Sequence, residues 1–147
     1  MFTISRRFAI AATLATALMS NPALAQDLTG TLKKIKDTGA ITLGHRESSI
    51  PFSYYDDKQQ VIGYSQEMML KAVDAIKAEL KLAKLDIKLM PVTSENRITL
   101  VQNGSVDLEC GSTTNTTERQ KQVSFSNSIF VVGTHLMTRS NAGQGLF

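Results

Sequence analysis

Hydrophobic residues near the start of the chain follow helical spacing first and strand spacing next. Leu28, Leu32 and Ile35 fall on one face of a short helix that Gly39 is expected to end. The apolar run 40–44, which contains β-branched residues, predicts a buried strand. The pattern therefore indicates a helix that leads directly into a core strand.

A second helix, a strand and a third helix follow along the chain. Ser65 is expected to cap a helix whose apolar stripe comprises Met69, Val73, Ile76 and Leu80. Apolar and polar residues alternate over 85–89, which predicts a strand that Pro91 ends. Ser94 is expected to cap the next helix, which stops before Gly104.

The remaining segments complete an alternating pattern. Residues 45–57 are expected to form a loop, 106–111 a strand and 116–122 a short polar helix or turn. Phe125 and the apolar run 129–137 are interpreted as further strands. The repeated strand–helix order predicts an α/β domain with a mostly parallel sheet flanked by helices.

The first 25 residues have the pattern of a secretory signal peptide. Arg6 and Arg7 precede an apolar run over 8–19, and the Ala-Leu-Ala sequence at 23–25 fits a cleavage site after Ala25. The alternatives are an uncleaved anchor and a buried N-terminal helix, but the run is shorter than the ~20 residues of a membrane span. We expect the mature protein to be soluble and exported.

The composition argues against a disordered chain, a collagen and a coiled coil. With 42% hydrophobic and 20% charged residues, the chain resembles a soluble globular domain. The single cysteine, Cys110, excludes an intrachain disulfide, and no ligand spacing supports a metal, so we expect no cofactor. The formal charge of +3 falls to about +1 without Arg6 and Arg7, so charge gives no reason to expect nucleic-acid binding.

Polar loops follow three of the expected strands and begin at His45, Thr93 and Gly111. In parallel sheets, ligands bind beside the carboxyl ends of the strands. These loops contain three arginines and a set of hydroxyl residues: Arg46, Arg97, Arg119, Ser94, Ser112, Thr113 and Thr114. Guanidinium groups bind carboxylates through paired hydrogen bonds, so we expect a small ligand with two carboxylates. The alternative is that each arginine pairs with a neighbouring surface glutamate: Glu47, Glu95 or Glu118.

Catalytic chemistry has weaker support. His45 or Glu47 could act as a base near the arginines, but neither has an evident orienting partner. The first loop contains three aromatic residues, Phe52, Tyr54 and Tyr55. They could belong to the core or form an apolar wall beside a ligand, and the sequence leaves both possibilities open.

Two stretches of the chain resemble a known family. Residues 44–67 (GHRESSIPFSYYDDKQQVIGYSQE) and 93–137, with the segments ECGSTTN and ERQKQ, are similar to the periplasmic glutamate/aspartate-binding proteins of ABC importers. These are family 3 solute-binding proteins. The resemblance implies the first lobe of a two-lobe, type II periplasmic-binding fold. It also implies a receptor, not an enzyme, that delivers an acidic amino acid to a membrane permease.

The resemblance also implies roles for individual residues. Arg119 matches the arginine that usually holds the α-carboxylate, and Ser112 and Thr114 match neighbouring contacts. The residues implied to face the side-chain carboxylate are Arg46, Ser94 and Arg97. Which of glutamate and aspartate is preferred stays open.

The resemblance covers only part of the family's usual length. Members are about twice as long, so residues 26–139 are expected to be the first lobe and 140–147 a truncated tail at the hinge. We therefore expect a fragment that retains half of the site and binds weakly. The alternatives are an exported dehydratase or lyase on the same fold, and an inactive remnant.

Overall fold

The computed structural model describes residues 28–133, 135, 137 and 139. The expected signal peptide at 1–25 and the expected tail at 140–147 lie outside this part of the chain. None of the helices within the described residues has the length and apolar character needed to cross a membrane.

A three-stranded parallel sheet forms the centre of the fold. It contains β1 (Ala40–His45), β5 (Asp86–Pro91) and β6 (Leu108–Glu109), in the order β5-β1-β6. β1 pairs along its whole length with β5 but with β6 only at Leu43 and Gly44. The predicted α/β class and parallel sheet are confirmed.

The segment expected to be a loop folds into a small antiparallel sheet. Its strands are β2 (Ser48–Ser49), β3 (Ser53–Tyr55) and β4 (Val61–Ile62). Asp56 makes the turn, because its carboxylate accepts the backbone N–H of Lys58 at 2.9 Å and of Gln60 at 2.8 Å. The loop prediction over 45–57 is wrong, since strands this short show no apolar alternation and only the turn residues indicate them.

Four helices connect these strands: α1 (Gly30–Thr38), α2 (Tyr64–Glu79), α3 (Arg97–Gln102) and α4 (Thr117–Gln120). Gly39 ends α1 in the left-handed conformation, with φ of 63°, as the sequence predicted. Gly63, not Ser65, precedes α2, and its φ of 121° suits only glycine. Ser65 lies inside α2, fully buried, where its hydroxyl donates to the Gly111 carbonyl at 2.8 Å.

Ser94 does not cap α3. The turn before this helix is closed by Thr93 and Asn96, which bond each other reciprocally. Thr93 Oγ1 accepts the Asn96 N–H at 3.2 Å, and Asn96 Oδ1 accepts the Thr93 N–H at 2.8 Å. This arrangement resembles a capping box that starts one residue earlier than the sequence suggested.

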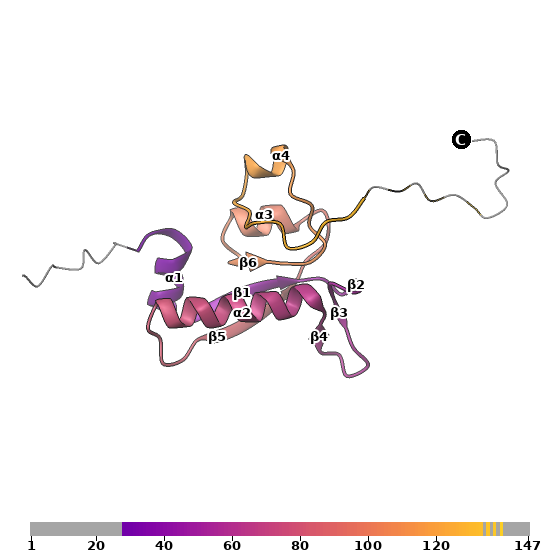
Figure 1. Cartoon of the computed structure of the whole chain (residues 1–147). Coiled ribbons are helices and arrows are strands. Elements are labelled where there is room, and N and C mark those ends of the chain that lie inside the picture. The colour runs from indigo at the N-terminus through magenta and orange to yellow at the C-terminus, as the bar shows by residue number, and fades with distance from the viewer. Residues whose placement is uncertain (1–27, 134, 136, 138, 140–147) are drawn as a thin grey trace, which may run out of the picture.

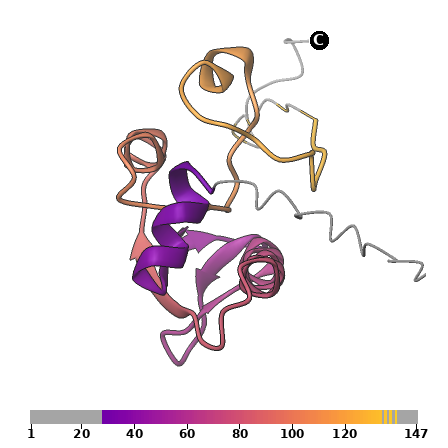
Figure 2. The same ribbon diagram turned by 90° about the vertical axis from the view of Figure 1, so that its left-hand side faces the viewer.

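The core lies on one face of β1. Ile41 and Leu43 point toward α1 and α2, where they join a buried cluster completed by Ile35, Met69, Val73 and Leu80. Figure 1 shows α2 running beside β1. On the other face of β1, Gly44 faces Val92 and Val106, both buried. Figure 2 looks along α2 and shows α1 nearest the viewer, in front of the strands.

The strands expected at Phe125 and 129–137 are wrong for the described residues of that segment, which form no strand. Phe130 instead packs edge-on against Phe52 and Tyr64, with ring centroids 5.0 and 6.0 Å away. The Tyr64 hydroxyl donates to the Ile129 carbonyl at 2.8 Å. The strand expected over 106–111 is likewise shortened to β6. An apolar, β-branched run forms a strand only where a neighbouring strand takes its backbone hydrogen bonds.

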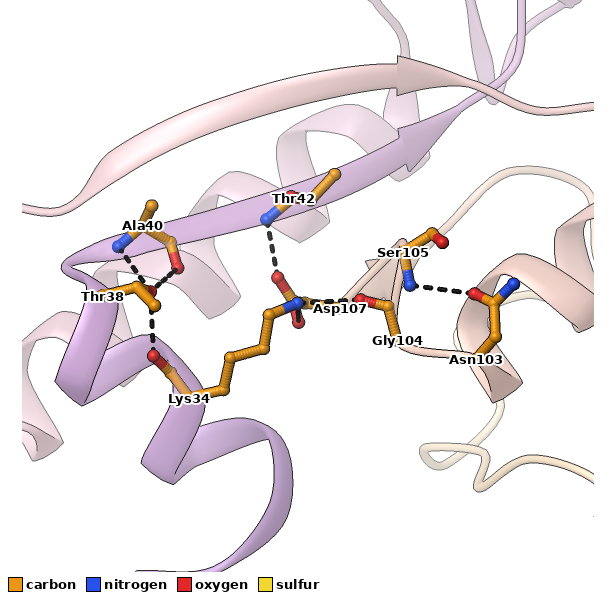
Figure 3. A network of polar contacts seen from close by, with 8 residues as sticks. All are labelled: Lys34, Thr38, Ala40, Thr42, Asn103, Gly104, Ser105 and Asp107. Carbon is orange, nitrogen blue, oxygen red and sulfur yellow. Dashed lines mark hydrogen bonds and ion pairs between the residues drawn. The ribbon is translucent and has the colours of Figure 1, made fainter.

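A buried aspartate fastens α1 to the central sheet (Figure 3). The Asp107 side chain is 2% exposed, and Lys34 Nζ donates to its Oδ1 and to the Gly104 carbonyl, both at 2.8 Å. The Thr42 N–H donates to the other carboxylate oxygen at 2.9 Å, and the Asp107 N–H donates to the Thr42 carbonyl at 2.9 Å. Because β6 is short, this cluster supplements its few ladder bonds to β1.

Replacing Asp107 with alanine is expected to lower the free energy of unfolding by about 2 kcal/mol. The substitution leaves the Thr42 N–H and the Lys34 ammonium without their acceptor. Urea denaturation followed by circular dichroism measures the change. Asp86→Ala is the matched control because Asp86 belongs to an exposed ion pair with Lys84, and its midpoint should match that of the parent chain. Equal midpoints for both variants would contradict the role given to Asp107.

Candidate functional site

Arg46 directly follows β1 and is held by contacts from three directions. Its backbone N–H donates to Ser53 Oγ at 2.9 Å, which ties it to β3. Its guanidinium donates through Nε to Ser49 Oγ at 3.2 Å and through Nη1 to the Val92 carbonyl, just past β5, at 2.8 Å. These bonds fix the direction of the side chain at the carboxyl edge of the central sheet.

Gly111 makes room for the Arg46 side chain. A Cβ atom at Gly111 would lie 2.6 Å from Arg46 Cγ and 3.2 Å from Glu109 Oε1. Arg46 and Glu109 therefore meet at the same glycine, one residue beyond Cys110. A glycine at this position is needed for close packing and not for its backbone freedom.

Arg97 is the first residue of α3 and one of the few buried charged residues. It is 5% exposed, and its Nε and Nη1 atoms are buried without a hydrogen-bond partner among the described residues. Burial lowers the pKa of its guanidinium, and the nearby charges of Arg119 and Arg46 act in the same direction, whereas Glu109 opposes them. Arg97 stays protonated at neutral pH, because an arginine begins from a very high pKa.

Glu109, which the sequence analysis missed, lies among the three arginines. Its Oε2 accepts the Thr113 hydroxyl at 2.8 Å, while its Oε1 is buried without a partner among the described residues. Burial raises the pKa of this carboxyl, and the Thr113 hydrogen bond and the charges of Arg97, Arg46 and Arg119 oppose the rise. The available sequence signal was a charged residue within the predicted strand 106–111, between Leu108 and Cys110.

Arg119 lies in α4, beyond the loop that follows β6. The Thr116 side chain caps this helix by accepting the Arg119 N–H at 3.3 Å, and Arg119 Nη1 donates to the Thr114 carbonyl at 2.8 Å. The charge of Arg119 reaches both Arg97 and Glu109. The three predicted arginines thus all interact electrostatically with Glu109, and Arg97 also interacts with the other two.

Two adjoining hollows lie beside this group. The larger, about 360 Å³, is lined by Ser112 and Thr114 together with aromatic residues that include Phe52 and Phe130. The smaller, about 150 Å³, is lined by Arg97. Glu109 and Thr113 line both hollows. Arg46, Arg119 and Ser94 line neither, and Ser94 is exposed in the turn before α3.

The pairing of each arginine with a surface glutamate is not found. Among the described residues, Arg46, Arg97 and Arg119 form no ion pair with a carboxylate, and Glu118 pairs with Lys121 at 2.8 Å instead. The guanidinium groups of Arg46 and Arg119 donate instead to a hydroxyl and to backbone carbonyls. Their charge is therefore not neutralised by the glutamates next to them in sequence.

His45 and Glu47, the two candidate bases, do not lie in either hollow. His45 is 2% exposed, its Nδ1 lies 3.2 Å from the Arg46 carbonyl, and its ring meets Tyr55 edge-on at 5.4 Å. Glu47 is exposed. Of the three aromatic residues left open by the sequence, Tyr55 packs against His45 and Phe52 lines the larger hollow. Tyr54 is half-buried in β3 and lines neither hollow.

Replacing Gly111 with alanine is expected to lower the free energy of unfolding by about 1–3 kcal/mol, because the added methyl group would meet the Arg46 stem. The double variant Gly111→Ala/Arg46→Ala removes the clash, so it should be no less stable than Arg46→Ala alone. Thermal unfolding of the four proteins measures this coupling. Additive losses would show that Arg46 is not what Gly111 accommodates.

Glu109→Gln is expected to stabilise the chain at neutral pH. The folded-state pKa of Glu109 is raised above its ordinary value of 4.5, so its stabilising contribution is complete below about pH 4.5 and is lost as the pH rises through the folded-state pKa. The variant stays neutral throughout. Its advantage in unfolding free energy should therefore be largest near pH 7 and vanish toward pH 4.5. Exposed Glu118→Gln is the control, and an identical pH profile for both variants would contradict the assignment.

Comparison with known proteins identifies the family. Residues 41–146 match the model of the bacterial extracellular solute-binding proteins, family 3. The chain is 59% identical over 127 residues to the L-glutamate/L-aspartate-binding protein of Pseudomonas aeruginosa, covering 86% of this chain and 42% of that one. It is 54% identical over 132 residues to the glutamate/aspartate import solute-binding protein of Escherichia coli K12, covering 87% and 44%.

Solved structures show the same fold. The solute receptor for L-cysteine of Neisseria gonorrhoeae superimposes with a TM-score of 0.58 at 26% identity, over 67% of this chain and 38% of that one. Domain 1 of TmArgBP, in an arginine-bound form, gives a TM-score of 0.58 at 21% identity, over 67% and 71%. The chain spans about two fifths of the length of the curated relatives it matches. The chain belongs to family 3 of the bacterial extracellular solute-binding proteins.

Proposed function

We propose that this chain contributes one half of a binding site for an acidic amino acid, glutamate or aspartate. The observation that carries the proposal is the gathering of Arg46, Arg97 and Arg119 around one buried edge of the central sheet. Arg97 contributes two buried donors without a partner among the described residues. A buried donor that stays unpaired costs about 1–3 kcal/mol, and more when charged, so a carboxylate at this place would be favoured.

The balance of charge supports a ligand with two carboxylates. Three guanidinium groups surround the buried carboxyl of Glu109, and the exposed carboxylate of Glu95 interacts only with Arg46 among them, so positive charge is left for an anion. A neutral amino acid would leave one of these guanidinium groups desolvated without compensation. In this proposal Arg119, Ser112 and Thr114 hold the α-carboxylate, and Arg46, Arg97 and Ser94 face the side-chain carboxylate.

The names of the close relatives support the biological setting. Two are described as a glutamate/aspartate-binding protein and a glutamate/aspartate import protein. We extend these descriptions to the present chain as the periplasmic receptor component of an amino-acid ABC importer, with a membrane permease as its partner. The chain would act by binding without chemical conversion, because His45 is buried against Tyr55 and Glu47 is exposed.

Titration of the isotopically labelled chain with L-glutamate tests the proposal. We expect saturable shifts of the backbone resonances of residues 111–119 and of Arg97. Arg119→Ala should weaken binding about 10- to 100-fold, because it removes hydrogen bonds from a charged donor. The neighbouring Lys121→Ala is the matched control and should bind like the parent chain, since Lys121 is exposed and pairs with Glu118.

Three results would contradict the proposal. The first is the absence of saturable shifts with either glutamate or aspartate. The second is an equal loss of affinity in Arg119→Ala and Lys121→Ala, which would point to general charge attraction. The third is turnover of the ligand, visible as new resonances that grow with time, which would favour an enzyme.

A further inference from the structure

We propose that Glu109 is a proton-coupled positioning residue of this site, which takes up one proton from the solvent when a dicarboxylate ligand binds. The inference rests on the proposed function, since it concerns the same arginines. It assigns a role to a residue that the proposed function does not use. The step is a proton transfer: the bond to hydrogen in a buffer acid breaks, an O–H bond forms on the Glu109 carboxyl, and the buffer is left as its conjugate base.

The two carboxyl oxygens of Glu109 have different surroundings. Oε2 is engaged by the Thr113 hydroxyl at 2.8 Å, and Oε1 is buried with no hydrogen-bond partner among the described residues. Gly44 and Gly111 allow this side chain to lie deep, because a Cβ at Gly44 would be 3.3 Å from Glu109 Cγ and a Cβ at Gly111 would be 3.2 Å from Oε1. A proton on the carboxyl would relieve the uncompensated burial of Oε1.

The surrounding charges explain why the carboxyl can remain ionised before ligand binds. Arg97 of α3, Arg46 after β1 and Arg119 of α4 all favour the carboxylate, and the neighbouring Cys110 thiol is a further titratable group that interacts with Glu109. Burial already outweighs these three charges and raises the pKa of Glu109. The ionised form of Glu109 is therefore stabilised only as long as these guanidinium groups do not bind another anion.

A ligand with two carboxylates competes for those same guanidinium groups. Its negative charges would cancel the support that the arginines give to Glu109 and would act on Glu109 as like charges. Both effects favour protonation, so ligand and proton should bind together. Thermodynamic linkage then makes affinity fall as the pH rises, by at most tenfold per pH unit for one proton. When a ligand with a single carboxylate binds, Glu109 should take up a smaller fraction of a proton.

Calorimetry of the full chain with L-glutamate, in buffers of different ionisation enthalpy between pH 5.5 and 8, tests this inference. We expect proton uptake and weaker affinity at higher pH in the parent chain, and neither in Glu109→Gln. The control Glu118→Gln should retain both, because Glu118 is exposed and pairs with Lys121. L-glutamine in place of L-glutamate should reduce the uptake.

The outcomes separate this inference from the proposed function. No binding of glutamate by the parent chain overturns the proposed function. Binding without proton uptake, or uptake that persists in Glu109→Gln, overturns the role of Glu109 alone. If Glu109→Gln does not fold, carbon-13 NMR of the parent chain measures the same carboxyl directly. Its pKa must rise on saturation with glutamate, and an unchanged pKa would overturn the inference.

Discussion

Desolvation of charge at the carboxyl edge of the central sheet is the constraint on which this structure depends. Arg97 is 5% exposed, and a carboxyl oxygen of Glu109 is buried beside it without a hydrogen-bond partner among the described residues. Such groups cost free energy unless a partner arrives. A fold built only for stability would replace them with apolar residues of similar volume. The ligand that we propose would supply the charges that these groups lack.

The rest of the fold serves to hold these groups against that cost. The core formed by α1, α2 and β1 supplies the burial, and Asp107 fastens α1 and β1 to the start of β6. The serines of β2 and β3 fix Arg46, and Ser65 of α2 holds the carbonyl of Gly111. These contacts stabilise the fold and also hold the chain next to the charged residues of the site. Stability and the placement of charge are therefore linked.

The sequence predicted the architecture well because the architecture depends on apolar spacing. The stripe of α2 and the run of β1 are periodic enough to identify, and the parallel order follows from their alternation. The small sheet from β2 to β4 was missed because two- and three-residue strands carry no period. The run 129–137 was misjudged for the opposite reason. It has the composition of a strand, but its described residues have no paired strand to take their backbone hydrogen bonds.

The site was predictable only in part, because sequence shows which charges follow strands but not which are buried. Arg46, Arg97 and Arg119 were found by their positions after strands, and the structure places them in one electrostatic neighbourhood. Glu109 was missed because it lies within a strand, and a single carboxylate there is as compatible with the solvent face as with the interior. The burial of the Glu109 carboxyl, however, affects the balance of charge around all three arginines. Arg46 and Arg119 are anchored by carbonyls, whereas Arg97 and Glu109 hold buried polar atoms without partners, so these two residues should respond most strongly to a bound anion.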